Sequence, residues 1–301
     1  MGNTNLTAQK PKFSVAIGTP TYQKLINQTL GDKKKAERYT AAIMSAVATN
    51  PQLQNCEAKT ILSGSLLAES LNLAHSPQLG QYYLVPFKVK AKNGIPEHYD
   101  AQFILGYKGY IQLAIRSGQY RKINVMEIKE GELVSYNPFD EDIELNPIQD
   151  VDEREKTPTA GYYAMFEYVN GFRKVLYWSK KQMLAHADKY SQAFSAKAYE
   201  RLLNGEIPQQ DLWKFSSFWY KDFDSMAKKT LIRQLIGKWG VMSAEMSQAM
   251  DSDNAVINAS DSGGSFAPVT VEEEQLIDEP TEEISVNADT EEVNEVDIND
   301  L

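Results

Sequence analysis

Apolar positions recur at helical spacing in the first part of the chain. The helical face between about Lys34 and Ala48 comprises Ala36, Tyr39, Thr40, Ile43, Met44 and Val47. Asn50-Pro51 ends this helix. A second predicted helix, from about Glu57 to Leu73, is apolar on most sides, which is typical of a buried helix. Residues 1–24 are polar with few apolar anchors, so we expect a flexible arm there.

From Gln81 onward the pattern changes to that of strands. Residues 81–105 predict two strands around the turn Lys92-Asn93-Gly94, and a short helix follows at about Tyr107–Ser117. The next strands are predicted near Ile123–Ile128 and Glu132–Tyr136, before an acidic loop that runs to about Thr159. Residues 161–179 predict a hairpin that turns at Asn170-Gly171. Helices are then expected near Lys180–Tyr190 and at about Phe218–Trp239.

This order of elements predicts an α+β fold, in which an antiparallel β-meander sheet is packed with helices. Strands and helices do not alternate, as a doubly wound nucleotide-binding fold requires. We expect a flexible arm at 1–24, one folded domain at 25–245, and a disordered acidic tail at 246–301.

Charge is distributed unevenly along the 301 residues, whose net charge is −10. Residues 246–301 hold 16 of the 41 Asp and Glu and none of the 31 Lys and Arg, so the first 245 residues carry +6. The tail cannot bury enough apolar surface to order itself. Two roles for it stay open: it regulates the basic domain, or it only aids solubility.

Catalytic and metal-binding signatures are missing from the sequence. It contains no GxxxxGK[ST], GxGxxG or GxSxG, and its one cysteine and three scattered histidines lack metal-ligand spacing. We therefore expect no cofactor and no enzymatic activity, although Mg²⁺ could modulate DNA binding. The acidic run Asp140, Glu141, Asp142 and Glu144 suits either a solvated loop or a metal-dependent nuclease. Neither a signal peptide nor an apolar span is present, so a cytoplasmic protein is expected.

Two segments combine basic and aromatic residues, as single-stranded nucleic-acid binding requires, because cations neutralise phosphates while rings stack on bases. In the first, residues 103–125, Tyr107, Ile111, Ala114 and Ile115 are predicted to face the core. Lys108, Gln112 and Arg116 lie on another face, and Arg121 and Lys122 follow the helix. Gly106 and Gly109 would let phosphates approach the exposed amide groups of the helix. A solvated basic face explains the same lysine and arginines without DNA.

The second segment, residues 213–240, is a helix whose predicted core side comprises Trp219, Phe223, Met226 and Thr230. The opposite arc contains Lys221, Lys228, Lys229 and Arg233, and Asp222 is the one acidic residue there. A solvated helix normally mixes charge signs, so this bias favours an anionic partner.

At these segments the chain resembles a known family. LGYKGYIQLAIRSGQ (105–119), MAKKTLIRQL (226–235) and LVPF (84–87) are similar to signature stretches of the RecT family of single-strand annealing proteins. The resemblance runs from about Leu25 to Met242. The sequence departs from the family pattern at about 191–212, where the segment is longer than usual. This departure leaves open whether Trp213 and Lys214 contact DNA.

The resemblance implies a phage or prophage recombinase that binds single-stranded DNA and pairs it with a complementary strand without ATP. It also implies rings or helical filaments, with DNA in a basic groove, and a partner exonuclease of 5′→3′ direction. A host single-strand-binding protein is a further candidate partner. By motif, the DNA-binding residues are expected to be Lys108, Arg116, Arg121, Lys122, Lys221, Lys228, Lys229 and Arg233.

Two alternatives remain at this point. The first is a passive single-stranded DNA-binding protein, or an oligomer whose basic faces are only solvated surface. The second is the metal-dependent nuclease, which depends on the acidic run alone.

Overall fold

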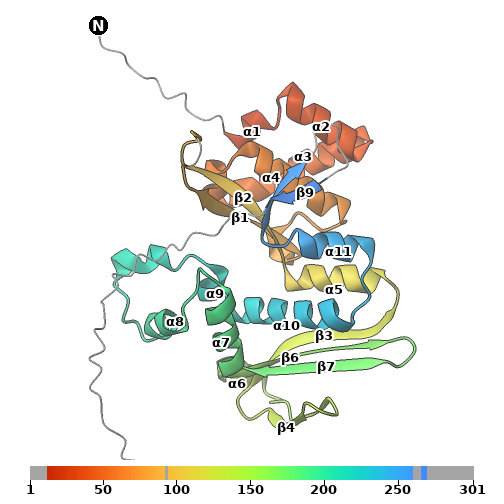
Figure 1. The fold of residues 1–301 in the computed structure, drawn as a ribbon, viewed down its shortest axis with the longest axis vertical. Coiled ribbons are helices and arrows are strands. Elements are labelled where there is room, and N and C mark those ends of the chain that lie inside the picture. The colour runs from red at the N-terminus through yellow and green to blue at the C-terminus, as the bar shows by residue number, and fades with distance from the viewer. Residues whose placement is uncertain (1–11, 92–93, 260–265, 270–301) are drawn as a thin grey trace, which may run out of the picture.

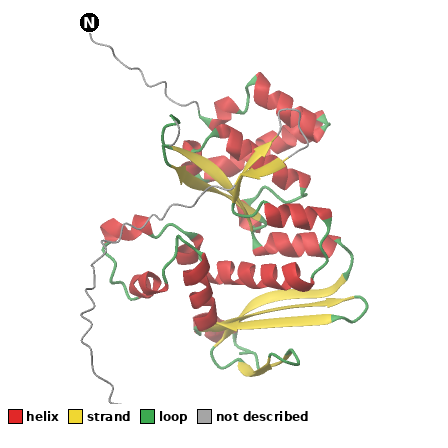
Figure 2. Ribbon diagram, viewed as in Figure 1, coloured by secondary structure: helices red, strands yellow, loops and turns green. Residues whose placement is uncertain are grey.

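A computed structural model describes residues 12–91, 94–259 and 266–269. It forms two lobes that share a middle layer of helices (Figures 1 and 2). The upper lobe contains α1 (Phe13–Ala16), α2 (Pro20–Leu30), α3 (Lys33–Thr49), η1 (Pro51–Asn55), α4 (Ala58–Ser70), η2 (Pro77–Leu79), β1 (Tyr82–Val89), β2 (His98–Leu105), β8 (Ala255–Ala259) and β9 (Phe266–Val269).

The lower lobe is built on a second sheet. It contains β3 (Tyr120–Lys129), β4 (Leu133–Asn137), β5 (Asp142–Leu145), α6 (Val151–Lys156), β6 (Thr159–Tyr168), β7 (Arg173–Ser179), α7 (Lys180–Tyr190), α8 (Ala196–Leu203), η3 (Gln209–Lys214), α9 (Phe218–Lys221) and α10 (Phe223–Trp239). The helices α5 (Tyr107–Arg116) and α11 (Ala244–Asp251) lie between the lobes (Figure 1).

The described strand pairs are antiparallel, apart from one isolated parallel bridge between Cys56 and Tyr99, which confirms the predicted α+β class. They do not form one continuous meander. The upper sheet has the order β1-β2-β8-β9, the lower sheet β3-β6-β7, and β4 pairs with β5 as a separate ribbon. The meander is interrupted because β2 pairs with β8, with Gln102 opposite Val256, instead of with the next strand along the chain.

Both ends of the predicted domain differ from the structure. Residues 13–30 form α1 and α2, and Phe13, Ile17 and Ile26 are buried, so the flexible-arm prediction is wrong for that stretch. Three apolar side chains spaced along two short helices are enough to anchor the segment to α3. At the other end, the predicted tail from residue 246 begins inside the fold, because α11 and β8 pack into the core. The rest of the tail, 260–265 and 270–301, lies outside the described residues.

Two further differences concern local structure. The predicted helix 218–239 is divided into α9 and α10 at Asp222, whose side chain accepts a hydrogen bond from the Ser225 amide and starts the new helix. The predicted acidic loop up to Thr159 contains β5 and α6. The turn residues 92–93 fall outside the described ranges.

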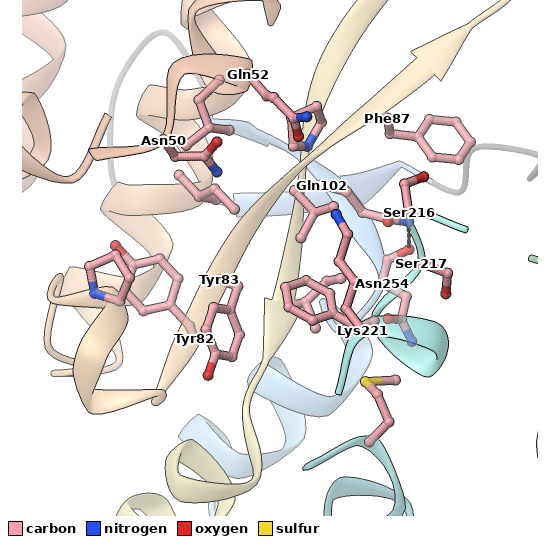
Figure 3. A pocket seen from close by; sticks show the side chains of 18 of the residues that line it. Asn50, Gln52, Tyr82, Tyr83, Phe87, Gln102, Ser216, Ser217, Lys221 and Asn254 are labelled. Atoms are coloured by element: carbon pink, nitrogen blue, oxygen red, sulfur yellow. Dashed lines mark hydrogen bonds between the residues drawn. The ribbon is translucent and has the colours of Figure 1, made fainter. Parts of the chain in front are cut away.

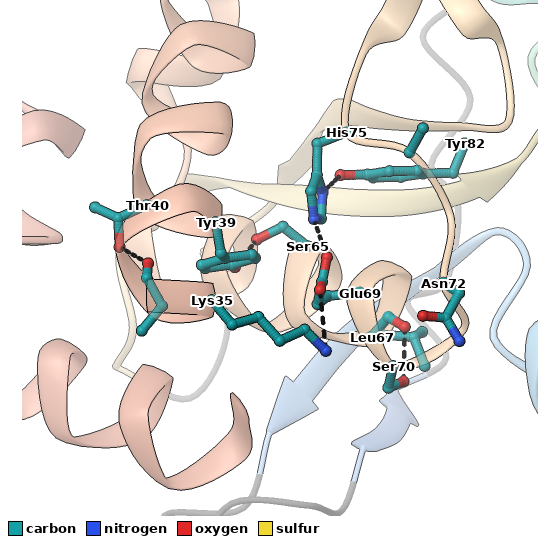
Figure 4. A network of polar contacts seen from close by, with 12 residues as sticks. Lys35, Tyr39, Thr40, Ser65, Leu67, Glu69, Ser70, Asn72, His75 and Tyr82 are labelled. Atoms are coloured by element: carbon teal, nitrogen blue, oxygen red, sulfur yellow. Dashed lines mark hydrogen bonds and ion pairs between the residues drawn. The ribbon is translucent and has the colours of Figure 1, made fainter. Parts of the chain in front are cut away.

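A partly buried polar network connects the helices of the upper lobe to β1 (Figure 4). His75 hydrogen-bonds through Nδ1 to the Tyr82 hydroxyl at 2.6 Å and through Nε2 to Glu69 at 2.8 Å. Glu69 also forms an ion pair with Lys35 of α3 at 3.2 Å. The hydrogen bond from His75 and the neighbouring Lys35 hold the pKa of Glu69 below its ordinary value, against the effect of its partial burial. The network therefore holds β1, at the edge of the upper sheet, against α3 and α4.

Asp253, on the short connection between α11 and β8, joins the two lobes. Its fully buried carboxylate accepts hydrogen bonds from the Leu105 amide at 2.9 Å and the Tyr110 hydroxyl at 3.1 Å. It also forms ion pairs with Lys229 at 2.7 Å and Arg233 at 2.8 Å, both on α10. Burial lowers the pKa of Lys229, and the charge of Asp253 opposes that shift. We refer to these five residues as the interlobe ion cluster.

None of the helices in the described ranges combines the length and apolar content that a bilayer crossing requires.

We predict that Asp253→Ala lowers the free energy of unfolding by about 3–5 kcal/mol, because it leaves the buried ammonium of Lys229 without a counter-charge. The measurement is chemical denaturation. Asp251→Ala is the matched control, since Asp251 is exposed two residues away. Equal stability of the two variants would contradict the structural role of Asp253.

A second prediction concerns Gly109→Ala, which we expect to lower the stability of the protein, whereas helix propensity alone predicts an increase. A Cβ at Gly109 would lie 2.1 Å from the Gln81 carbonyl oxygen, so Gly109→Ala forces α5 away from the start of β1. We expect a loss of about 1–3 kcal/mol of unfolding free energy, whereas propensity alone predicts a gain of about 1 kcal/mol. Gln112→Ala on the same helix is the control, and a stabilised Gly109→Ala protein would refute the packing argument.

Candidate nucleic-acid interface

A groove lies between the lobes, open to solvent on one side, with a volume of about 640 Å³ (Figure 3). Its upper wall includes Tyr83 and Phe87 of β1 and Gln102 of β2. Its lower wall is formed by residues 216–219, Lys221 and Met226. Tyr83 and Phe87 point to the same side of β1 because strand side chains alternate between the two faces of a sheet. We call this space the interlobe groove.

Aromatic and basic side chains from four elements, β1, α5, α9 and α10, lie in or beside the interlobe groove, and Tyr83, Phe218 and Lys221 are among the residues that line it. The Tyr83 and Phe218 ring centroids are 5.4 Å apart, so β1 and α9 approach through their rings. The ammonium groups of Lys108 and Lys228 lie 5.9 Å and 5.1 Å from the centroid of Tyr107. We call Tyr83, Tyr107, Lys108, Phe218, Lys221 and Lys228 the groove cluster.

The electrostatics of the groove cluster suit an anionic ligand. Burial raises the pKa of the Tyr83 hydroxyl, and the nearby charge of Asp222 adds to the effect, so this ring stays neutral. Lys108 and Lys221 are exposed. Lys228 is partly neutralised by an ion pair with Glu127 at 3.1 Å, and the charge of Lys228 helps to lower the pKa of Glu127 against its burial. Lys108 therefore offers an exposed ammonium group beside the ring of Tyr107, and Lys221 offers a second one in the groove wall.

The remaining predicted DNA-binding residues do not all join this cluster. Lys229 is 5% exposed and belongs to the interlobe ion cluster, so the prediction that it contacts DNA is wrong for this conformation. Arg233 pairs with the same carboxylate, although its side chain remains 39% exposed. The helical wheel put Lys229 on the basic arc, but the counter-charge of Lys229 is Asp253, which lies in the segment that was predicted to be the acidic tail.

Arg116 has a structural partner at the other end of α5. Its guanidinium donates to the Leu71 carbonyl at 2.6 Å and to the Asn72 carbonyl, and so caps the C-terminal end of α4. Arg121 and Lys122 are exposed at the start of β3, and Arg121 pairs with Glu167 at 3.1 Å. Glu127, next to the groove cluster, lies near the opposite end of this strand. The structure thus brings Lys108 and Lys228 together at the ring of Tyr107, places Lys221 in the wall of the groove, and separates Arg121 and Lys122 from them.

The core face of α5 also differs from the prediction. Tyr110, Leu113 and Ala114 are buried, whereas Ile115 is 51% exposed and Tyr107 is half-buried beside the groove. Gly106 and Gly109 are buried against the backbone of Gly80 and Gln81, where an added Cβ would clash. They allow close packing of α5 on the chain before β1, and the predicted approach of phosphates to this helix end is wrong.

The acidic run 140–144 does not gather into a cluster. Glu141 forms an ion pair with Lys174 at 2.6 Å, and Asp140 accepts a hydrogen bond from Asn137. Among the described residues, no group of three or more His, Cys, Asp or Glu side chains is arranged to hold a metal ion.

The sequence argument missed Tyr83 and Phe218. Both lie in aromatic-rich runs, YYLVPF and SSFWY, which the strand and helix patterns assign to the core. Tyr82 is 5% exposed whereas Tyr83 is half-buried, and the ring of Tyr83 gains its partner Phe218 only when α9 folds against β1. The sequence did contain a signal, because Tyr82 and Tyr83 are adjacent in one strand and their side chains must point to opposite faces of the sheet.

Comparison with known proteins gives a consistent assignment. Residues 37–268 match the family model of the RecT family. The chain is 35% identical over 248 residues to the uncharacterised protein YqaK of Bacillus subtilis (strain 168), which covers 82% of this chain and 74% of that protein. It is 27% identical over 238 residues to Protein RecT of Escherichia coli (strain K12), which covers 79% of this chain and 78% of that protein.

The family match includes both basic-aromatic segments, the groove cluster and the interlobe ion cluster. At the level of the family, the role is recombination by single-strand annealing, with DNA binding and oligomerisation, and members are annealing proteins rather than classical enzymes. With most of its length matched, this chain belongs to the RecT family.

Proposed function

We propose that this protein binds single-stranded DNA in the interlobe groove and anneals it to a complementary strand without nucleotide hydrolysis. The observation that carries the proposal is the groove cluster, in which exposed ammonium groups flank partly exposed aromatic rings. Phosphates bind the lysines and unpaired bases stack on the rings, and both interactions tolerate any sequence. An annealing protein needs such contacts, because it must bind its first strand whatever the base sequence of that strand.

Within this proposal the predicted residues have unequal roles. Lys108, Lys221 and Lys228 contact phosphates from the groove cluster, and Arg233 extends the basic surface along α10. Arg121 and Lys122 form a separate exposed pair, which suits contact with the annealed duplex or with a neighbouring subunit's DNA. Lys229 and Arg116 do not contact DNA in this proposal, because their side chains stabilise the fold. Partners such as a 5′→3′ exonuclease and a host single-strand-binding protein remain part of the proposal.

Removal of charge in the groove should weaken binding at every DNA sequence. In Lys108→Gln/Lys221→Gln, each lost phosphate contact should reduce the slope of log affinity against log salt by about 0.7 on single strands. Equilibrium titrations over a range of salt concentrations measure this slope. Lys33→Gln/Lys34→Gln is the matched control, because these exposed lysines lie at the start of α3, on the helical layer of the upper lobe. An unchanged slope in the groove variant would remove the basis for the site.

Annealing itself is tested with labelled complementary oligonucleotides in the absence of ATP, with magnesium varied. Faster duplex formation than in protein-free solution supports the proposal. Binding without faster annealing identifies a passive single-stranded DNA-binding protein, and shortening of the strands identifies a nuclease. The groove variant should lose annealing in step with its loss of binding.

A further inference from the structure

A second cavity, of about 670 Å³, opens beside the interlobe groove between α7 and one side of α10. One wall is formed by Trp178 at the end of β7 and by His186 and Tyr190 of α7. The two cavities are adjacent, because Tyr190, Ser191, Trp219, Met226 and Asn254 line both of them. We call it the α7–α10 pocket.

The aromatic wall of this pocket is a row of rings that ends in solvent. The centroids of Trp178 and His186 are 5.1 Å apart, and those of His186 and Tyr190 are 4.6 Å apart. His186 and Tyr190 are four residues apart on α7 and therefore lie on the same side of the helix. The capping box of Ser179 and Gln182 fixes the start of this helix. Trp178 and His186 are half-buried, whereas Tyr190 is 66% exposed at the outer end of the row, with the ammonium of Lys189 5.1 Å from its ring centroid.

The charge state of His186 suits stacking. Burial lowers the pKa of its imidazole, and the nearby Lys189 lowers it further, so the ring is neutral near pH 7. A neutral imidazole packs against tryptophan and tyrosine without the desolvation of a charge.

The opposite wall is polar and includes Thr230, Arg233 and Gln234. The ion pair with Asp253 fixes one guanidinium nitrogen of Arg233, while 39% of the side chain stays exposed. Gln234 is exposed and offers an amide that both donates and accepts hydrogen bonds. An aromatic row that faces an arginine and an amide has the chemistry of a base-binding site, because the ring face is apolar and the edge of a base is polar.

We propose that the α7–α10 pocket receives an unpaired base of the bound strand, stacked on Tyr190 and His186, while Arg233 holds the adjoining phosphate. This inference rests on the proposed function and adds to it a contact with the base itself. Thr230 and Gln234 contact the base edge without the fixed donor and acceptor pattern that would select one base.

The test compares two oligonucleotides of equal length, a thymidine homopolymer and an abasic chain with the same sugar-phosphate backbone. Tyr190→Ala should weaken binding of the homopolymer by about five-fold to a hundred-fold, the loss of one stacked base. It should leave binding of the abasic chain unchanged, and Tyr190→Phe should restore the homopolymer affinity. Phe139→Ala is the matched control, because Phe139 is 94% exposed on the β4–β5 turn, outside both cavities.

The outcomes separate this inference from the proposed function. If the wild-type protein binds the homopolymer and Tyr190→Ala binds it equally well, the pocket does not hold a base and the inference falls alone. A loss that is equal on both oligonucleotides also overturns it, because the contact is then with the backbone. A base-independent loss accompanied by a smaller assembly in sedimentation assigns the pocket to a second copy of the chain and overturns it as well. A wild-type protein that binds neither oligonucleotide refutes the proposed function, and the inference with it.

Discussion

The buried carboxylate of Asp253 is the contact on which the arrangement of the two lobes depends. It binds the backbone at the junction of β2 and α5, the hydroxyl of Tyr110, and two cations on α10. A charge in this position is unfavourable unless all its partners are present, because each buried ion loses its hydration. The cluster therefore tolerates one relative position of the lobes, and the width of the interlobe groove follows from that position.

The same cluster determines which cations remain for a ligand. Lys229 is used entirely inside the fold, Arg233 is oriented by Asp253 but stays partly exposed, and Lys228, on the adjoining side of α10, reaches the ring of Tyr107. The cations of α10 thus have three positions: Lys229 lies in the core, Arg233 lines the α7–α10 pocket, and Lys228 lies beside the groove. The exposed Lys108 and Lys221 complete the basic surface from neighbouring elements. Exposure, and not the number of basic residues, defines the candidate interface.

Local patterns in the sequence predicted most of the elements but not their partners. The helices near Lys34–Ala48 and Lys180–Tyr190 and the hairpin at Asn170-Gly171 depend on short-range spacing and capping, and the structure contains them at similar bounds. The pairing of β2 with β8 joins Gln102 to Val256, and no local pattern encodes such a distant partner. Asp253 was assigned to the acidic tail for the same reason, since composition alone does not distinguish a buried carboxylate from a solvated one. The prediction that Lys229 contacts DNA came from the family motif and the basic arc of the helix, and neither shows that its counter-charge is Asp253.

The insertion of β8 beside β2 also sets the order in which the protein becomes complete. A chain is synthesised from its N-terminus, so β1, β2, α5 and α10 all emerge before the segment that contains Asp253 and β8. Until that segment arrives, β2 has an open edge and the cations of α10 lack their counter-charge. Contacts between residues so far apart in sequence form late and slowly. The groove, whose lining includes Asn254, is therefore complete only after β8 has joined the upper sheet.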